Sequence, residues 1–291
     1  MAGTKEIRKR IASVKNTQQI TKAMKMIAAV KLRRAQENIL AARPYALLTM
    51  DVLRSLALRA DEKAHPLLAQ RSPKNVWIFV VTSDRGLCGS YNSTIIRETE
   101  GYIKKQGHLY ENITLAFIGR RGYEYFKKRT IGIGTYYKDV MNNVTYDQAA
   151  KIGKDIISAY VEENLDAIYL VYNEFKSAIS QKVTVEQLLP IKPMALDIIG
   201  EKETAIDYLY EPNRKEVLND LLPRHIKIQL YRVLLEANAS EHGARMTAMD
   251  SATRNAGDMI SRLTLLYNRL RQQAITTELV EIVSGAEALK A

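Results

Sequence analysis

Apolar and small side chains recur every three or four residues along the first part of the chain. This spacing is that of a heptad repeat, and it predicts a long helix with one apolar seam. The seam consists of Ile7, Ile11, Val14, Ala28, Leu32, Ala35, Ile39 and Ala42. Polar Gln18, Thr21 and Lys25 occupy the in-phase positions between its two halves and interrupt it.

The composition around this seam also favours a long helix. No glycine occurs in residues 5–85, and Ala, Lys, Arg, Gln, Met and Leu dominate the first part of that stretch. We expect a helix over residues 4–58, with Thr4 as its N-cap. Pro44 is expected to bend this helix or to be accommodated by a local break, because proline lacks the backbone N–H that a helix interior uses.

A second seam lies near the end of the chain. Its members again step by four and three residues: Ala256, Ile260, Leu263, Tyr267, Leu270, Ala274 and Thr277. We expect a helix from about residue 216 to residue 284, weakened at Gly243 and Gly257 and stopped by Gly285. Neither seam can be buried by one helix alone, so the two helices are expected to pair as an antiparallel, left-handed coiled coil.

The middle of the chain has a different pattern. Short apolar runs rich in β-forming residues predict buried strands at 76–81, 113–118, 131–136 and 167–172. Helical stretches are expected between them, near 90–106, 120–129 and 146–163. Alternating strands and helices predict a parallel sheet with right-handed crossovers. Two further segments, 182–190 and 204–210, could add edge strands.

These patterns together predict an α+α/β fold, in which a Rossmann-like α/β domain is inserted between two long helices. The expected boundaries are 1–60 for the N-terminal coiled-coil helix, 75–200 for the α/β domain and 215–291 for the C-terminal coiled-coil helix. No apolar run reaches the 18 residues that a membrane-spanning helix needs, and the start of the chain does not resemble a secretory signal. These features favour a cytoplasmic bacterial protein.

The charge of the chain is concentrated at one end. Residues 1–43 contain 11 Lys or Arg and only two acids, a local balance of +9 within a total of +11. Such a segment attracts an anionic partner over a long range. Nucleic acid, acidic lipid and an acidic protein surface all fit this charge, and composition does not choose among them.

No pattern in the chain predicts catalysis. Ser83-Asp84-Arg85-Gly86-Leu87-Cys88-Gly89-Ser90 follows the first strand, but it has neither a dinucleotide-binding nor a P-loop glycine pattern, and a tight turn stabilised by Asp84 and Arg85 is the simpler interpretation. Cys88, the only cysteine, is interpreted as a small packed residue. The histidines have no metal-binding spacing. We therefore expect no catalytic residue, no cofactor and no metal.

Two other functions are compatible with parts of the pattern. A basic coiled coil with an α/β body could bind RNA or DNA, although residues 1–44 contain no aromatic residue for stacking on bases. Salt-dependent, sequence-independent nucleic-acid binding would favour that function. The α/β body alone could be a small flavodoxin-like enzyme, which a bound coloured cofactor or nucleotide would reveal.

Several stretches, in order along nearly the whole chain, resemble the gamma subunit of F-type ATP synthases. They are Glu6 to Ile11, Thr21 to Met26, Ser83 to Gly89, Tyr208 to Pro212, Glu241 to Met249 and Asn268 to Gly285. Each stretch alone is a modest signal, whereas the ordered set is specific. Gly243 departs from this family's pattern, which often has Ala there, and Ser90 stands where the family often has Gly. The paired regulatory cysteines of chloroplast relatives are absent.

The resemblance implies a mechanism. The coiled coil would turn inside a ring of three alpha and three beta subunits, while the α/β domain would lie against the epsilon subunit and the membrane c ring. Proton flow would rotate this central shaft and change the conformations of the catalytic beta subunits in turn, so that the chain itself performs no chemistry. The resemblance further implies a peripheral location on the cytoplasmic face of the bacterial plasma membrane, and no nucleic-acid partner.

The resemblance also assigns positions to individual residues. Residues in contact with the beta subunit would be Met24, Lys25, Arg245, Gln272, Thr276 and Glu278. An apolar tip held in a hydrophobic bearing would consist of Ile275, Leu279, Ile282 and Val283. The foot near the c ring would include Tyr208 and Glu211. An acidic loop on beta, opposite Met24 and Lys25, is the kind of partner that the basic N-terminal helix predicts.

Overall fold

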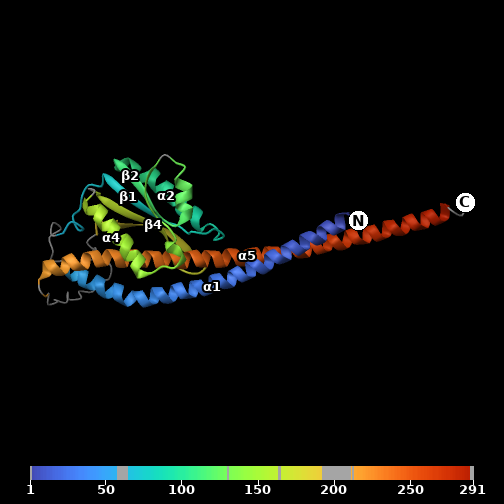
Figure 1. The fold of residues 1–291 in the computed structure, drawn as a ribbon, viewed down its shortest axis with the longest axis horizontal. Coiled ribbons are helices and arrows are strands. Elements are labelled where there is room, and N and C mark those ends of the chain that lie inside the picture. Colours follow the sequence, from blue (N-terminus) through green and yellow to red (C-terminus); the bar gives the residue numbers. More distant parts are fainter. Residues whose placement is uncertain are drawn as a thin grey trace. The chain divides into compact units, whose positions relative to one another are not determined.

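The computed structural model describes residues 2–57, 65–129, 131–162, 165–191, 211 and 213–288. They form two units: one contains the N-terminal residues up to 28 together with residues 246–288, and the other lies within residues 29–245. Helices α1 (Ala2–Ala57) and α5 (Arg214–Ala288) each contribute to both units. Figure 1 shows α1 and α5 as the two long helices of the chain.

The unit within residues 29–245 is built on a five-stranded sheet. Its strands are β1 (Asn75–Val81), β2 (Asn112–Ile118), β3 (Gly132–Tyr137), β4 (Ala167–Phe175) and β5 (Gln181–Leu189). Their order in the sheet is β3-β2-β1-β4-β5. The first four strands are parallel, as expected, and β5 is the predicted edge strand, antiparallel to β4. The other expected edge segment, 204–210, lies outside the described residues.

Helices cover both faces of this sheet. One face packs against α2 (Tyr91–Gln106) and α3 (Arg120–Phe126), through buried residues such as Ile95 and Phe126. The other face packs against α4 (Tyr146–Glu162) and the first part of α5. Two short 3-10 helices, η2 (Gly107–Leu109) and η3 (Val140–Asn142), complete the connections. The expected doubly covered α/β architecture is therefore confirmed.

The first part of α5 forms part of the core of this unit. Its buried residues recur at helical spacing and join the cluster under β4 and β5: Leu218, Leu222, Ile226, Leu230, Val233, Leu234 and Ala237. Asn213 directly precedes the helix, and its side-chain oxygen accepts a hydrogen bond from the Glu216 N–H at 2.9 Å. This cap satisfies one of the N–H groups that a helix start leaves unpaired.

The other unit is an antiparallel pair of helical segments, residues 2–28 of α1 and residues 246–288 of α5. As α1 runs from Gln18 to Lys25, its partners on α5 run backwards from Thr253 to Asp250. The seam positions Ile7, Ile11 and Val14 are half-buried and Ala28 is buried, as the heptad spacing predicts. The predicted antiparallel pairing of the two ends of the chain is therefore confirmed.

Three details of the helices differ from expectation. Helix α1 begins at Ala2, so Thr4 lies inside the helix and is not its N-cap. The helix also continues through Pro44, so the expected alternative of a local break is wrong, while a bend at Pro44 stays a prediction. Helix α5 continues past Gly285 to Ala288. The reason is that a C-terminal glycine stops a helix only when the following chain folds back, and the residues after Gly285 are good helix formers.

Candidate functional site

The polar interruption of the first seam forms a set of hydrogen bonds between the two helices. The Gln18 side-chain amide donates to the Thr253 carbonyl at 3.4 Å, and the hydroxyl groups of Thr21 and Thr253 lie 2.8 Å apart. Thr21 is buried although it is polar. We call Gln18, Thr21, Lys25, Asp250 and Thr253 the polar layer. Because their bonds need matching partners, they fix which residues of the two helices face each other.

Lys25 completes the polar layer with an ion pair. Its Nζ lies 2.6 Å from Asp250 Oδ1, and Arg254 lies 3.3 Å from the other carboxylate oxygen. The hydrogen bond from Lys25 lowers the pKa of Asp250 below its usual value. Met24, beside Lys25, is half-buried. Of the two residues expected to face an acidic partner, Lys25 therefore contacts an acidic group of its own chain.

The last residues of α5 form an exposed helical tip. Every described side chain from Ile275 to Ala286 is exposed, although many are apolar. The four predicted bearing residues are 48%, 58%, 68% and 63% exposed, in the order Ile275, Leu279, Ile282 and Val283. The predicted contact residues Gln272, Thr276 and Glu278 are exposed in the same region. Large apolar side chains exposed together are typical of a surface that contacts a protein, a membrane or a ligand.

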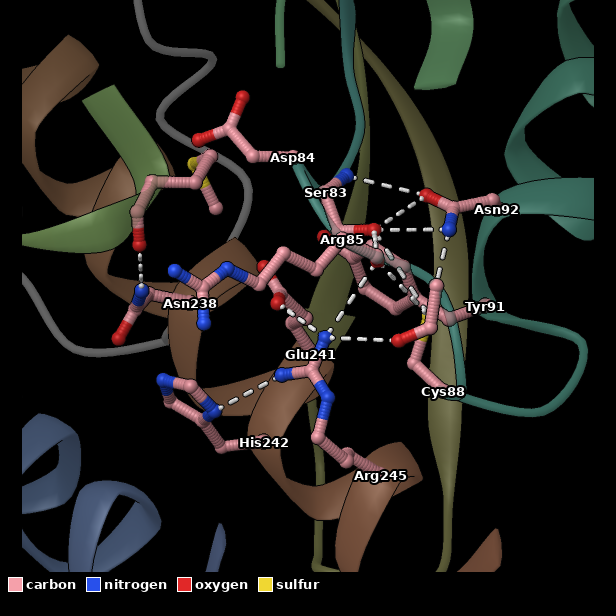
Figure 2. Close-up of polar contacts among 12 residues, drawn as sticks. Ser83, Asp84, Arg85, Cys88, Tyr91, Asn92, Asn238, Glu241, His242 and Arg245 are labelled. Carbon is pink, nitrogen blue, oxygen red and sulfur yellow. Dashed lines mark hydrogen bonds and ion pairs between the residues drawn. The ribbon is translucent and has the colours of Figure 1, made fainter. Parts of the chain in front are cut away.

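The turn after β1 is held by its own polar groups. We call residues 83–89 the βα turn (Figure 2). The Ser83 N–H donates to the Asn92 side chain at 3.0 Å, and the Ser83 hydroxyl donates to the Arg85 carbonyl at 2.6 Å. Leu87 has a left-handed backbone conformation with φ 62°, and its side chain is 64% exposed. A leucine in this conformation is strained, and the surrounding hydrogen bonds must maintain it.

Two residues of α5 pair beneath the βα turn. Arg245 Nη2 lies 2.7 Å from Glu241 Oε1, and these side chains are only 12% and 6% exposed. The same guanidinium donates to the carbonyl groups of Arg85 and Gly86, at 3.4 and 3.3 Å (Figure 2). It also lies 3.2 Å from His242 Nδ1. The predicted beta-contact residue Arg245 is thus engaged inside its own chain.

The protonation states beneath the turn follow from burial. Burial raises the pKa of Glu241, and the nearby Arg245 opposes this shift. Burial, together with the positive charge of Arg245, lowers the pKa of His242 to about 4, so this histidine is neutral at pH 7. A neutral His242 can accept the hydrogen bond that Arg245 offers through Nη1. The arrangement is therefore a largely buried pair of Glu241 and Arg245 beside a neutral acceptor.

Cys88 has a packing role, as the sequence predicts. It is 2% exposed, and burial raises the pKa of its thiol, so the reactive thiolate is disfavoured. Asp84 accepts a hydrogen bond from the Arg120 backbone N–H at 3.1 Å and so joins the βα turn to α3. Among the described residues, no group of three potential metal ligands comes together.

A second charge network, which is partly buried, joins α5 to the sheet, and the sequence did not reveal it. Arg232 Nη2 lies 2.6 Å from Glu186 Oε1 on β5, and Arg232 Nη1 lies 3.1 Å from Glu236. The Tyr172 hydroxyl donates to the other Glu186 oxygen at 2.7 Å. Burial alone would lower the pKa of Arg232. The negative charge of Glu186 outweighs this effect and raises the pKa, so the guanidinium stays charged. This network attaches α5 to the sheet.

The predicted foot is only partly visible. Tyr208 lies outside the described residues, and Glu211 is exposed just before α5. The assignment of both residues to a c-ring contact stays a prediction.

Known proteins resemble the chain along its whole length. The model of the family described as ATP synthase matches residues 3–289. Relatives named ATP synthase gamma chain are 49% identical in Geotalea daltonii and 50% identical in Geobacter metallireducens, each over 290 residues that cover all of both chains. A chain from the rotor of the Euglena gracilis mitochondrial ATP synthase shares the fold, with a TM-score of 0.63 at 20% identity over 94% of this chain and 99% of that chain.

Proposed function

Because the chain belongs to the family of ATP synthase gamma chains, we propose that it is the central rotor shaft of a bacterial F-type ATP synthase. In this role it couples rotation of the membrane c ring to the conformational cycle of the catalytic beta subunits, and it is not itself an enzyme. Membership of this family favours the rotor over a nucleic-acid binder and over a flavodoxin-like enzyme.

The observation that carries this function is the pairing of the two chain ends. A shaft must transmit torque, and one helix alone twists easily, whereas two helices joined by cross-helix hydrogen bonds resist slipping past each other. The polar layer supplies these bonds, with Lys25 and Asp250 in direct contact at 2.6 Å. The apolar tip at Ile275 to Val283 extends this pair and has no partner among the described residues.

The partners that we propose follow the family. They are three alpha and three beta subunits around the helical pair, the epsilon subunit, and the c ring. None of the described helices has an apolar stretch that could cross a bilayer. We propose that the chain is held peripherally at the cytoplasmic face of the plasma membrane by these partners.

The contact residues that we propose fall into three groups. Met24 and Lys25 face an acidic loop of beta, and Gln272, Thr276 and Glu278 face the beta catch region. The exposed side chains of Ile275, Leu279, Ile282 and Val283 occupy an apolar bearing formed by the ring, because burying such side chains there removes apolar surface from water. Arg245 belongs to the same functional set.

Affinity purification from membranes tests the function directly. The chain carries a tag at its N-terminus, and the complex is extracted in mild detergent and quantified by mass spectrometry. We expect alpha and beta subunits at three copies each per copy of this chain. Membranes containing the untagged chain provide the background. Recovery of the chain alone, or with nucleic acid in place of these subunits, would show that the function is wrong.

A further inference from the structure

Arg245 has little surface left with which to contact another subunit. Its side chain is 12% exposed, and its guanidinium is shared among the Glu241 carboxylate, the His242 ring and two carbonyl groups of the βα turn. A side chain that gives its hydrogen bonds to its own chain cannot give the same bonds to a partner without breaking them. A direct contact with the beta subunit is therefore a poor explanation for a functional role of Arg245.

The two carbonyl groups that accept from Arg245 belong to Arg85 and Gly86. These residues precede Leu87, the residue held in the left-handed conformation. Figure 2 shows Arg245 rising from α5 to the inner side of the βα turn. Arg85 and Leu87 are exposed on the surface of the same turn. Arg245 thus bonds to the backbone of the turn on the side that faces α5. The exposed side chains of the turn lie on its opposite side.

Glu241 fixes the guanidinium in this place. The ion pair spans four residues of α5, and both side chains are buried, so Arg245 cannot swing away without leaving the Glu241 carboxylate unpaired. Tyr91, the first residue of α2, follows the turn directly, and its hydroxyl donates to the Ala237 carbonyl of α5 at 3.1 Å. The βα turn and the start of α2 are therefore attached to α5 at two levels, separated by two turns of the helix.

We propose that Arg245 is a positioning residue: it contributes to rotary coupling by fixing the conformation of the βα turn against α5. This inference rests on the proposed function, because coupling exists only in the assembled synthase. It differs from a direct beta contact in one measurable respect. Loss of Arg245 must loosen the turn, and the turn contains the only cysteine of the chain.

Cys88 reports on the state of the turn. Its thiol is 2% exposed and lies within bonding distance of the Arg85 carbonyl and the Asn92 amide, at 3.9 and 3.2 Å. A turn that opens exposes this thiol to a maleimide reagent. The rate of labelling is measured on the gamma peptide by mass spectrometry, so cysteines of other subunits do not interfere.

The experiment compares Arg245→Ala, Arg245→Lys and the wild type in the assembled complex. We expect Arg245→Ala to raise the labelling rate of Cys88 at least about tenfold and to lower the number of protons pumped per ATP hydrolysed. Arg245→Lys keeps the positive charge. It should therefore show a smaller rise in the labelling rate and a smaller loss of proton pumping than Arg245→Ala. Arg224→Ala is the control, because it removes an arginine from an exposed pair four residues apart on the same helix and should change neither.

Each outcome decides the inference. Reduced coupling with Cys88 protected as in the wild type would mean that Arg245 acts by direct contact. Increased labelling with unchanged coupling would mean that the turn plays no part in coupling. If Arg245→Ala does not assemble, Glu241→Gln replaces it, since this change also frees the guanidinium and should expose Cys88. A wild-type chain that never enters the synthase would instead refute the proposed function, and labelling would still show whether Arg245 holds the turn.

Discussion

Lys25 on α1 and Asp250 on α5 form an ion pair with 2.6 Å between Nζ and Oδ1, although 225 residues separate them in the sequence. Both side chains are partly exposed, so water reaches the pair. Arg254 also contacts Asp250, which therefore keeps a positive neighbour when Lys25 moves away. If Lys25 turns to the acidic loop proposed on beta, Asp250 is therefore not left as an isolated carboxylate.

Asp250→Asn is expected to reduce coupling. Without the Asp250 charge, Lys25 is attracted more strongly to the acidic loop proposed on beta, and rotation past that loop becomes harder. Protons pumped per ATP hydrolysed in inverted membrane vesicles should fall, while the amount of assembled complex stays constant. Lys25→Gln added to Asp250→Asn should restore coupling, because it removes the excess attraction. A double variant that couples no better than Asp250→Asn would contradict this explanation.

Met24→Lys is expected to impair coupling more than assembly. Met24 is half-buried next to Lys25, so a lysine there adds a second positive charge at the same surface. Coupling is measured as above, and assembly is measured from the amounts of alpha and beta subunits recovered with the chain. Met24→Leu, which conserves volume and adds no charge, is the matched control and should behave like the wild type. Wild-type coupling in Met24→Lys would remove Met24 from the proposed beta contact.

The periodic parts of the fold could be predicted from the sequence, because local spacing determines them. The seams at Ile7 to Val14 and Ala256 to Ala274 identified both long helices, and the short apolar runs identified the strands. The part of α5 near Leu222 and Leu230 carries an apolar stripe as well, but a stripe does not tell whether a sheet or another helix covers it. Its place under the sheet therefore became clear only from the structure.

The polar contacts could not be predicted, because they join residues that are distant in sequence. Gln18, Thr21 and Lys25 were visible as an interruption of the seam, but no local signal identified Thr253 and Asp250 as their partners. Family resemblance likewise assigned Arg245 to a contact with beta without revealing its bonds to the βα turn. The polar residues that interrupt the first seam were therefore the one sequence signal that marked the position of the polar layer.

Two glycines in the α/β unit should respond oppositely to substitution by alanine. A Cβ on Gly119 would lie 1.9 Å from the Thr82 carbonyl oxygen, and this residue has φ 93°. Gly119→Ala should therefore lower the free energy of unfolding by more than about 2 kcal/mol. Gly101, inside α2, has open space where its Cβ would be, so Gly101→Ala should raise that free energy by about 1 kcal/mol. Urea titrations of the full-length chain measure both, and equal effects would contradict the packing around Gly119.

The stability of the chain is expected to fall as the pH drops from 7 to 5, owing to two buried histidines. Burial lowers the pKa of His225 and of His242 from 6.5 to about 4, with Arg232 adding to the shift at His225 and Arg245 and Lys31 adding to it at His242. Between these pH values the unfolded chain binds protons that the folded chain excludes, so unfolding becomes easier as protons are added. The loss at pH 5 should reach about 2 kcal/mol per histidine.

Variants isolate this effect from the other titrating groups. Glu236 and Glu241 have pKa values raised by burial, so they favour the folded chain as the pH falls and oppose the histidines. These glutamates are present in every variant, and the informative quantity is therefore the difference from the wild type. His225→Gln and His242→Gln should each weaken the dependence of the unfolding free energy on pH, measured in urea at pH 7, 6 and 5. His108→Gln, at an exposed site in η2, should leave it unchanged. If all three variants follow the wild-type profile, the buried histidines are not responsible for loss of stability in acid.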